Sequence, residues 1–165
     1  MEGKPASASS SQIVHWMGVG DANSAGNIHG GTVMKLVDEA AGLAAIKHSR
    51  RRVVTAGMDR MTFLVPIQVG ELVSFSATVN AAWRTSMEVG VRVQAENPRT
   101  GVVRHTNTAY LTMVALDEQG QPTAVPPVIA QTETEVRRQR EAELRRGNRL
   151  AEREEIVRRR ADEPA

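Results

Sequence analysis

The stretch GDANSAGNIHGGTVMKLVDEAAGLAAIKH, residues 20–48, decides the fold of this chain. Turn-forming residues open it, with Asn27 as the expected N-cap, and residues 28–48 then form a helix that is apolar on almost every side. Such a helix belongs in the interior of a domain. Asp38 nevertheless lies near its middle, and a carboxylate among small and apolar groups is costly to keep without a purpose. The functional argument therefore starts at Asp38.

After this helix the sequence changes to the period-two alternation of half-buried strands. With a short segment before the helix, five strands are expected, over residues 12–17, 53–65, 72–83, 87–95 and 102–116. Hairpin-linked strands with one apolar face need a cover, and the sequence offers one helix of the buried type. We predict an α+β domain in which a five-stranded antiparallel sheet wraps around that helix.

The domain is expected to occupy residues 11–120, between a flexible N-terminus at 1–10 and a proline-rich linker at 121–130. Residues 131–165 hold ten arginines and nine acidic residues, and several pairs have the acid four positions before the arginine. This pattern is typical of a charged, solvated helix. Gly147 and Asn148 are expected to interrupt it.

Composition excludes several kinds of function. A net charge of +2 and an aromatic content of 3% argue against a nucleic-acid partner. Without cysteine there is no thiol nucleophile, disulfide or cysteine metal site, and the four histidines lack metal-ligand spacing. No stretch approaches the roughly 18 apolar residues of a membrane span. We expect a cytoplasmic protein with no metal site and no membrane partner.

Three features of the first stretch can carry chemistry, and each has a structural alternative. Asp38 could act as a general base or nucleophile, or a neighbouring strand or Lys35 could simply satisfy its charge. The N–H groups near Gly31, at the start of the helix, suit an oxyanion or a thioester carbonyl, although tight packing would also favour glycine. Asn23 could position a water molecule or a carbonyl group, or could only form a turn.

Three separate segments then resemble the acyl-CoA thioesterases of the hotdog fold. They are DANSAGNIHGGTVMKLVDEAAG from residue 21, VVTAGMDRMTFLVPIQVGE from residue 53, and AWRTSMEVGVRV from residue 82. The resemblance covers about residues 12–118. It implies a long central helix wrapped by an antiparallel sheet, and subunits joined edge to edge as dimers that commonly assemble into hexamers. It also implies acyl-CoA as substrate, with no separate cofactor.

By position, the resemblance places the catalytic aspartate at Asp38 and the catalytic asparagine at Asn23, contributed by opposite subunits. Backbone N–H groups near Gly31 would polarise the thioester oxygen. The implied CoA contacts form two segments and one residue of the charged tail: Ala56, Gly57 and Met58; Thr85, Ser86 and Met87; and Arg145 for the nucleotide phosphates.

The expected reaction is hydrolysis of acyl-CoA to a free acid and CoA. One alternative is a hotdog hydratase or dehydratase, which uses a histidine with a carboxylate. His29 and Asp38 lie about 13 Å apart along the helix axis, which argues against that chemistry within one subunit. A non-catalytic acyl-CoA-binding protein is the second alternative, and a structural oligomer whose charged tail binds a partner is the third.

Overall fold

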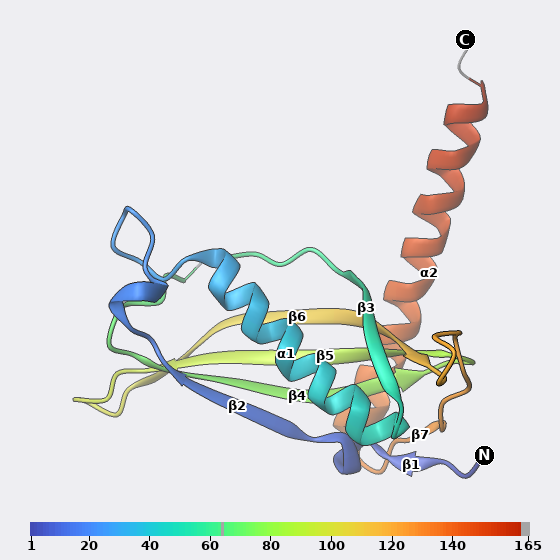
Figure 1. The fold of residues 1–165 in the computed structure, drawn as a ribbon, viewed down its shortest axis with the longest axis horizontal. Helices are drawn as coiled ribbons and strands as arrows, with labels where there is room; N and C mark the ends of the chain where they lie inside the picture. Colours follow the sequence, from blue (N-terminus) through green and yellow to red (C-terminus); the bar gives the residue numbers. More distant parts are fainter. Residues whose placement is uncertain (64, 163–165) are drawn as a thin grey trace.

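A five-stranded antiparallel sheet curls around one long helix, as the sequence predicts (Figure 1). The computed structural model describes residues 1–63 and 65–162. The elements are, in order, β1 (Lys4–Pro5), the 3₁₀ helix η1 (Ala6–Ser9), β2 (Ser11–Trp16), the 3₁₀ helix η2 (Val19–Asp21), α1 (Gly30–Ser49), β3 (Arg52–Met58), β4 (Leu72–Ala82), β5 (Ser86–Glu96), β6 (Val103–Leu116), β7 (Val128–Ile129) and α2 (Glu133–Asp162). Within the described ranges, no helix is long and apolar enough to cross a membrane.

The strand order in the sheet is β2-β4-β5-β6-β3, and every pairing is antiparallel. β2 and β3 are therefore the two edges. Backbone groups on the outer side of β3 have no neighbouring strand among the residues that the structure describes. An edge of this kind is available for pairing with another chain.

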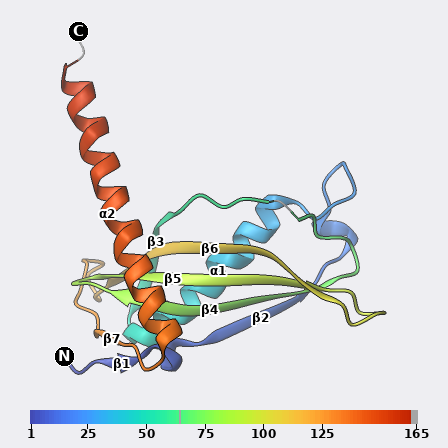
Figure 2. The same ribbon diagram turned by 180° about the vertical axis from the view of Figure 1, so that it is seen from behind.

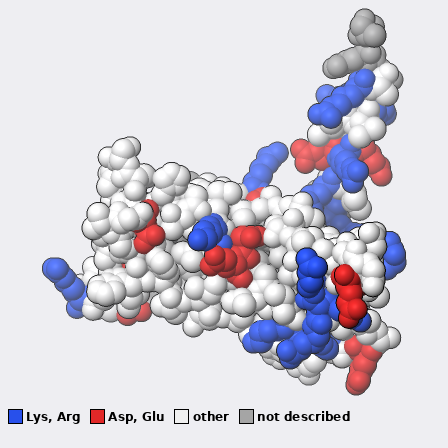
Figure 3. Space-filling model, viewed as in Figure 1, with Lys and Arg blue, Asp and Glu red and all other residues white. Residues whose placement is uncertain are grey.

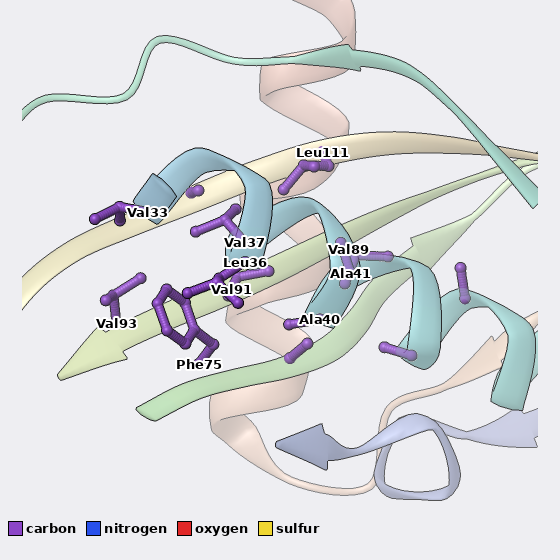
Figure 4. Close-up of a cluster of buried hydrophobic side chains, with 14 of the residues drawn as sticks. Val33, Leu36, Val37, Ala40, Ala41, Phe75, Val89, Val91, Val93 and Leu111 are labelled. Atoms are coloured by element: carbon purple, nitrogen blue, oxygen red, sulfur yellow. The ribbon is translucent and has the colours of Figure 1, made fainter. Parts of the chain in front are cut away.

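The core lies between α1 and the concave face of the sheet (Figure 4). Alanines at positions 40, 41, 44 and 45 let the helix approach the strands closely. Larger side chains fill the remaining space, and burial of each stabilises the fold by roughly 1.5–3 kcal/mol. The fully buried set on the strands includes Phe75, Val89, Val91, Val93 and Leu111.

The N-cap of α1 is His29 rather than Asn27, so that prediction is wrong. The His29 side chain accepts a hydrogen bond from the N–H of Gly31. Asn27 instead accepts one from the side chain of Gln68, 41 positions along the chain. The better capping residue is used in a tertiary contact, and the helix begins two residues later than expected.

β3 ends at Met58, well before the predicted end at residue 65. Its pairing with β6 shifts between Thr55 and Gly57, as in a β-bulge. Beyond Met58 the carboxylate of Asp59 binds Arg149 of α2 at 2.8 and 3.1 Å, and the chain leaves the sheet. Leu64, part of the predicted strand, lies outside the described residues.

Helix α2 covers the convex face of the sheet, opposite α1, and its second half projects beyond the strands (Figures 1 and 2). It is continuous through Gly147, contrary to the predicted interruption. One reason is that α2 is anchored to the sheet two residues before Gly147, where the Arg145 guanidinium binds Glu88 of β5 through two hydrogen bonds of 2.7 and 3.0 Å. Residues 163–165 of the predicted tail lie outside the described residues.

Glu88 is fully buried, although the strand alternation places it on the polar side of β5. That side faces α2, and Asn80 donates a hydrogen bond to the carboxylate at 3.1 Å. Both faces of this part of the sheet are therefore covered. The guanidinium of Arg145 also stacks 3.6 Å from the centre of the Tyr110 ring.

Residues 4–9 pack against the domain, within the segment 1–10 that the sequence predicts to be flexible. β1 pairs with β7, inside the predicted linker. Ser9 is fully buried and accepts a hydrogen bond from the N–H of Val79. Close to β7, the imidazole of His48 lies buried at the end of α1, with Nε2 2.8 Å from the carbonyl oxygen of Pro126.

Candidate active site

Asp38 lies half-buried near the middle of α1, beside the free edge of β3. Its Oδ1 atom accepts a hydrogen bond from Oγ1 of Thr55 at 2.5 Å. Thr55 Oγ1 also lies 3.5 Å from the sulfur of Met113. Threonine is common in strands for reasons of backbone preference alone, so nothing in the sequence distinguished Thr55. The structure adds it to the candidate site.

The alternative in which Lys35 neutralises Asp38 does not hold. The Lys35 ammonium is 3.8 Å from Glu39, one helical turn away. Around Asp38 the outward face of α1 carries three large apolar side chains that are more than two-fifths exposed, Met34, Leu43 and Ile46. Figure 3 views the molecule from the side of α1, and most of the surface around the charged side chains on that side is uncharged. An apolar surface beside an unpaired strand edge is typical of a subunit interface.

Asn23 is exposed in the loop before α1. Its Oδ1 atom accepts hydrogen bonds from the N–H groups of Ala25 and Asn27, at 2.9 and 3.3 Å. The side-chain oxygen therefore shapes a turn, and the amide N–H groups of Asn23 remain as its donors. Asp38 lies about 12 Å along the axis from the first residue of α1. One chain thus leaves Asn23 and Asp38 apart.

The loop that carries Asn23 is braced by Asp21. The N–H of Gly18 donates a hydrogen bond to the Asp21 carboxylate at 2.8 Å, and His15 Nε2 lies 3.1 Å from it. The Gly18 N–H and then His15 hold the pKa of Asp21 below its usual value. The Asp21 carbonyl accepts a hydrogen bond from the N–H of His29. These contacts tie the loop to the start of α1.

The N–H of Gly31 is occupied by the His29 cap, at 2.9 Å from Nδ1. Gly31 therefore does not offer this donor to a substrate in the present conformation, and the predicted role requires the His29 side chain to move. The cap engages Nδ1 of His29 only, so the separation along α1 remains the argument against a hydratase.

The predicted CoA segments lie on β3 and β5, with β6 between them. Ala56 and Gly57 are exposed at the free edge, and a Cβ atom on Gly57 would meet nothing within 4 Å. A chain lying along this edge could therefore approach the backbone closely. Met58 is half-buried and lines a cavity beneath α2.

At the hairpin between β4 and β5, Thr85 and Ser86 are half-buried, and their carbonyl oxygens accept hydrogen bonds from the N–H groups of Ala115 and Trp83. Met87 is fully buried in the core against α1. The predicted CoA contact at Met87 would therefore have to use backbone groups, because the side chain points to the interior.

Arg145 also has a role that differs from the predicted contact with phosphates. Its guanidinium is held by Glu88 and Tyr110 and anchors α2 to the sheet. It borders a cavity of about 650 Å³ between the end of β3, β6 and α2, which Arg60 and Arg149 also line. Of these three arginines, Arg60 is the most exposed, with its nearest carboxylate at 4.0 Å.

A family model described as the thioesterase superfamily matches residues 25–102. YkhA of Bacillus subtilis, named an uncharacterized acyl-CoA thioester hydrolase, is 40% identical over 116 residues, covering 70% of this chain and 67% of that protein. The chain belongs to the thioesterase superfamily. Another relative within that group, the cytosolic acyl coenzyme A thioester hydrolase of Rattus norvegicus, is 34% identical over 134 residues, 80% of this chain and 35% of the rat protein.

Solved thioesterase structures share the fold over nearly the whole chain. An apo-hexameric acyl-CoA thioesterase has a TM-score of 0.89 and 39% identity, with 92% of this chain and 97% of that chain covered. An acyl-CoA hydrolase from Staphylococcus aureus, solved with butyryl coenzyme A, coenzyme A and coenzyme A disulfide, has a TM-score of 0.87 and 34% identity, with 94% of each chain covered.

Three further structures of the S. aureus hydrolase carry alanine at an asparagine, an aspartate or a threonine position. In that chain the aspartate follows the asparagine by 15 residues, and the threonine follows the aspartate by 17. Asn23, Asp38 and Thr55 have the same two spacings. The spacing agrees with the two positions chosen from the sequence and with the hydrogen bond that adds Thr55.

Proposed function

We propose that this thioesterase-superfamily chain hydrolyses acyl-CoA thioesters to a free acid and CoA, without a separate cofactor. The observation that carries the proposal is Asp38, held by Thr55 beside an open strand edge. A carboxylate in that position can reach a substrate bound along β3. The names of the relatives, acyl-CoA thioester hydrolases, support the same substrate class.

In the proposed reaction Asp38 acts on the thioester by one of two routes. As a general base it takes a proton from water, whose oxygen attacks the carbonyl carbon. As a nucleophile it attacks that carbon itself and forms an anhydride that water then hydrolyses. In both routes the C–S bond breaks, the leaving sulfur gains a proton, and the acid departs. Thr55 orients the Asp38 carboxylate, and Asn23 of a partner subunit donates a hydrogen bond to the carbonyl oxygen or the water.

The proposed assembly follows from the exposed surfaces. Two copies paired along β3 would continue the sheet and cover the apolar side chains around Asp38. The same pairing would bring Asn23 of each copy towards Asp38 of the other, which one chain does not achieve. The hexameric structural relative supports a further assembly of three dimers, and the cytosolic relative supports a cytoplasmic location.

Thiol release from acyl-CoA tests the activity and the residues together. Asp38→Ala and Asn23→Ala should each lower kcat by at least a hundredfold with the oligomer unchanged. Glu39→Gln is the matched control, because this adjacent carboxylate pairs with Lys35 and should leave kcat within about twofold. Wild-type turnover in Asp38→Ala would remove Asp38 from the mechanism.

A mixture of the two inactive variants tests whether the site crosses the interface. Subunits refolded together should recover about a quarter of wild-type activity, because half of the dimers are mixed and each mixed dimer has one intact site. Each variant refolded alone is the control. Recovery no greater than in these controls would place both residues in one subunit.

A further inference from the structure

A cavity of about 240 Å³ lies at the N-terminal end of α1, beneath the segment that follows β3. Most of its lining is apolar, contributed by Ile28, Val33, Phe63, Val65, Pro66 and Ile67. Asn23 and Asn107 also line it. Because Asn23 is exposed and Asn107 is buried, the cavity extends from the loop surface to the sheet.

Asn107 is the polar exception in the row of β6 residues that faces α1. The next members of that row, Ala109 and Leu111, are fully buried in the core. Asn107 is 4% exposed, and its Nδ2 donates a hydrogen bond to the carbonyl of Thr62. Within the described part of the chain, its Oδ1 atom has no hydrogen-bond partner. A buried carbonyl oxygen without a donor is unfavourable, so this cavity contains an acceptor that a ligand can satisfy.

We propose that the cavity holds the far end of the acyl chain, and that Asn107 Oδ1 accepts a hydrogen bond from a hydroxyl group there. The inference rests on the proposed thioesterase activity. That proposal places Asn23 at the thioester, and Asn23 lines the cavity. An acyl chain that leaves the thioester carbon beside Asn23 therefore has an apolar space to enter.

The size of the cavity indicates the length of chain that it can hold. Its volume corresponds to about eight groups of about 30 Å³, the space that one water molecule occupies and close to that of a methylene. Phe63, which is 46% exposed, covers the outer side of the cavity, with its ring 3.6 Å from the place of a Cβ atom on Gly30. The substrate class is a medium-chain acyl-CoA that carries a hydroxyl group near the end of the chain. Phe63 determines the length of that chain and Asn107 determines its polarity.

The test measures kcat/KM by thiol release with butyryl-, octanoyl-, omega-hydroxyoctanoyl- and lauroyl-CoA. Phe63→Ala opens the side of the cavity that this half-exposed residue covers, so that a longer chain can extend past it, and should raise the lauroyl to octanoyl ratio at least fivefold. Asn107→Leu removes the acceptor and should lower the omega-hydroxyoctanoyl to octanoyl ratio about tenfold. Hydrolysis of butyryl-CoA, whose chain does not reach the far end, gives the reference rate for each variant. Val69→Ala is the matched control, because Val69 is exposed on the same segment and does not line the cavity.

The outcomes separate this inference from the proposed function. If wild-type protein releases no thiol from any of the four substrates, the thioesterase proposal fails. If wild-type protein is active and both ratios in Phe63→Ala and Asn107→Leu equal those in Val69→Ala, the cavity is not the acyl site. Should Asn107→Leu not fold, as judged by circular dichroism, Asn107→Ala removes the same acceptor without added bulk, and an unchanged ratio in it refutes the role of Asn107.

Discussion

Replacing Arg145 by methionine should loosen α2 from the sheet, because the change leaves a buried carboxylate short of a partner. Glu88 is fully buried and would retain Asn80 at 3.1 Å and Arg149 at 3.8 Å. Removing one member of a buried ion pair costs about 3–5 kcal/mol. The Arg145 side chain is 21% exposed, and Arg149 remains nearby. We therefore expect the lower end of that range, about 3 kcal/mol.

Urea unfolding followed by Trp83 fluorescence can measure this loss. The Trp83 Nε1 donates a hydrogen bond to Glu143 of α2 at 2.8 Å, so its emission reports whether the helix is docked. The chain has two tryptophans, and Trp16→Phe provides a background in which only Trp83 emits. With a slope of about 2 kcal/mol per molar urea, the midpoint should fall by about 1.5 M. Protomer concentration is held constant, because assembly also contributes to stability.

Two further variants make the result decisive. Adding Glu88→Gln to Arg145→Met removes the unpaired charge and should restore stability to within about 1 kcal/mol of wild type. Arg153→Met, on an exposed turn of the same helix, should change the free energy of unfolding by less than about 0.5 kcal/mol. A loss below about 1 kcal/mol in Arg145→Met, or no recovery in the double variant, would refute the argument that this ion pair holds α2.

Three other predictions concern pH and catalysis. Burial lowers the pKa of His48, so the unfolded chain binds a proton below about pH 6.5 that the folded chain excludes. The melting temperature should therefore fall from pH 7 to pH 5.5, and the fall should be smaller in His48→Gln. The Arg104 guanidinium lowers the pKa of Glu71, so the stabilisation from this ion pair is present above the ordinary glutamate pKa and disappears as pH falls through the folded value. In urea titrations Glu71→Gln should therefore cost about 2 kcal/mol at pH 7 and less at pH 3. An equal cost at both pH values would contradict the pairing. Thr55→Val should lower kcat about tenfold with little change in KM, since it removes the hydrogen bond to Asp38. Thr55→Ser keeps the hydroxyl group and should retain most of the activity. Equal kcat in the valine and serine variants would exclude an orienting role.

The sequence was sufficient to predict the sheet and its central helix. Alternation over residues 72–83 and 87–95 predicted β4 and β5 to within one residue at each end. The pattern is strong because one face of each strand packs on α1, with Phe75 and Val91 among the fully buried residues. Where one face of a strand packs against a single element, the buried residues follow the period-two alternation of the sequence.

The errors arose where a residue finds a distant partner. Asn27 has the better capping chemistry, but Gln68 uses it, and His29 caps the helix instead. Gly147 weakens a helix locally by about 1 kcal/mol, but contacts of α2 with β5 and with the end of β3 hold the helix together. Alternation puts Glu88 on the polar face of β5, and only the structure shows that α2 covers that face.

In the candidate site, too, residues with an unusual local sequence could be found, whereas residues that depend on a distant partner could not. Asp38 could be found because a carboxylate in an apolar helix is locally unusual. Thr55 could not be found, because its importance comes from one hydrogen bond between β3 and α1. The pairing of Arg145 with Glu88 is not visible in the sequence, and the phosphate contact of Arg145 stays a prediction. A residue that is unusual for its local sequence can be identified from the sequence, whereas polar pairs between distant residues are seen only in the structure.

Three consecutive exposed arginines lead from the end of α1 into the free edge strand β3, namely Arg50, Arg51 and Arg52, the first residue of the strand. Two copies aligned in parallel along this edge would bring six positive charges together at one end. An antiparallel alignment would place the two clusters at opposite ends of the seam, where salt screens them over about 8–10 Å. In the proposed dimer the arginines would therefore favour the antiparallel alignment, and their charge would disfavour pairing of other strands with that edge.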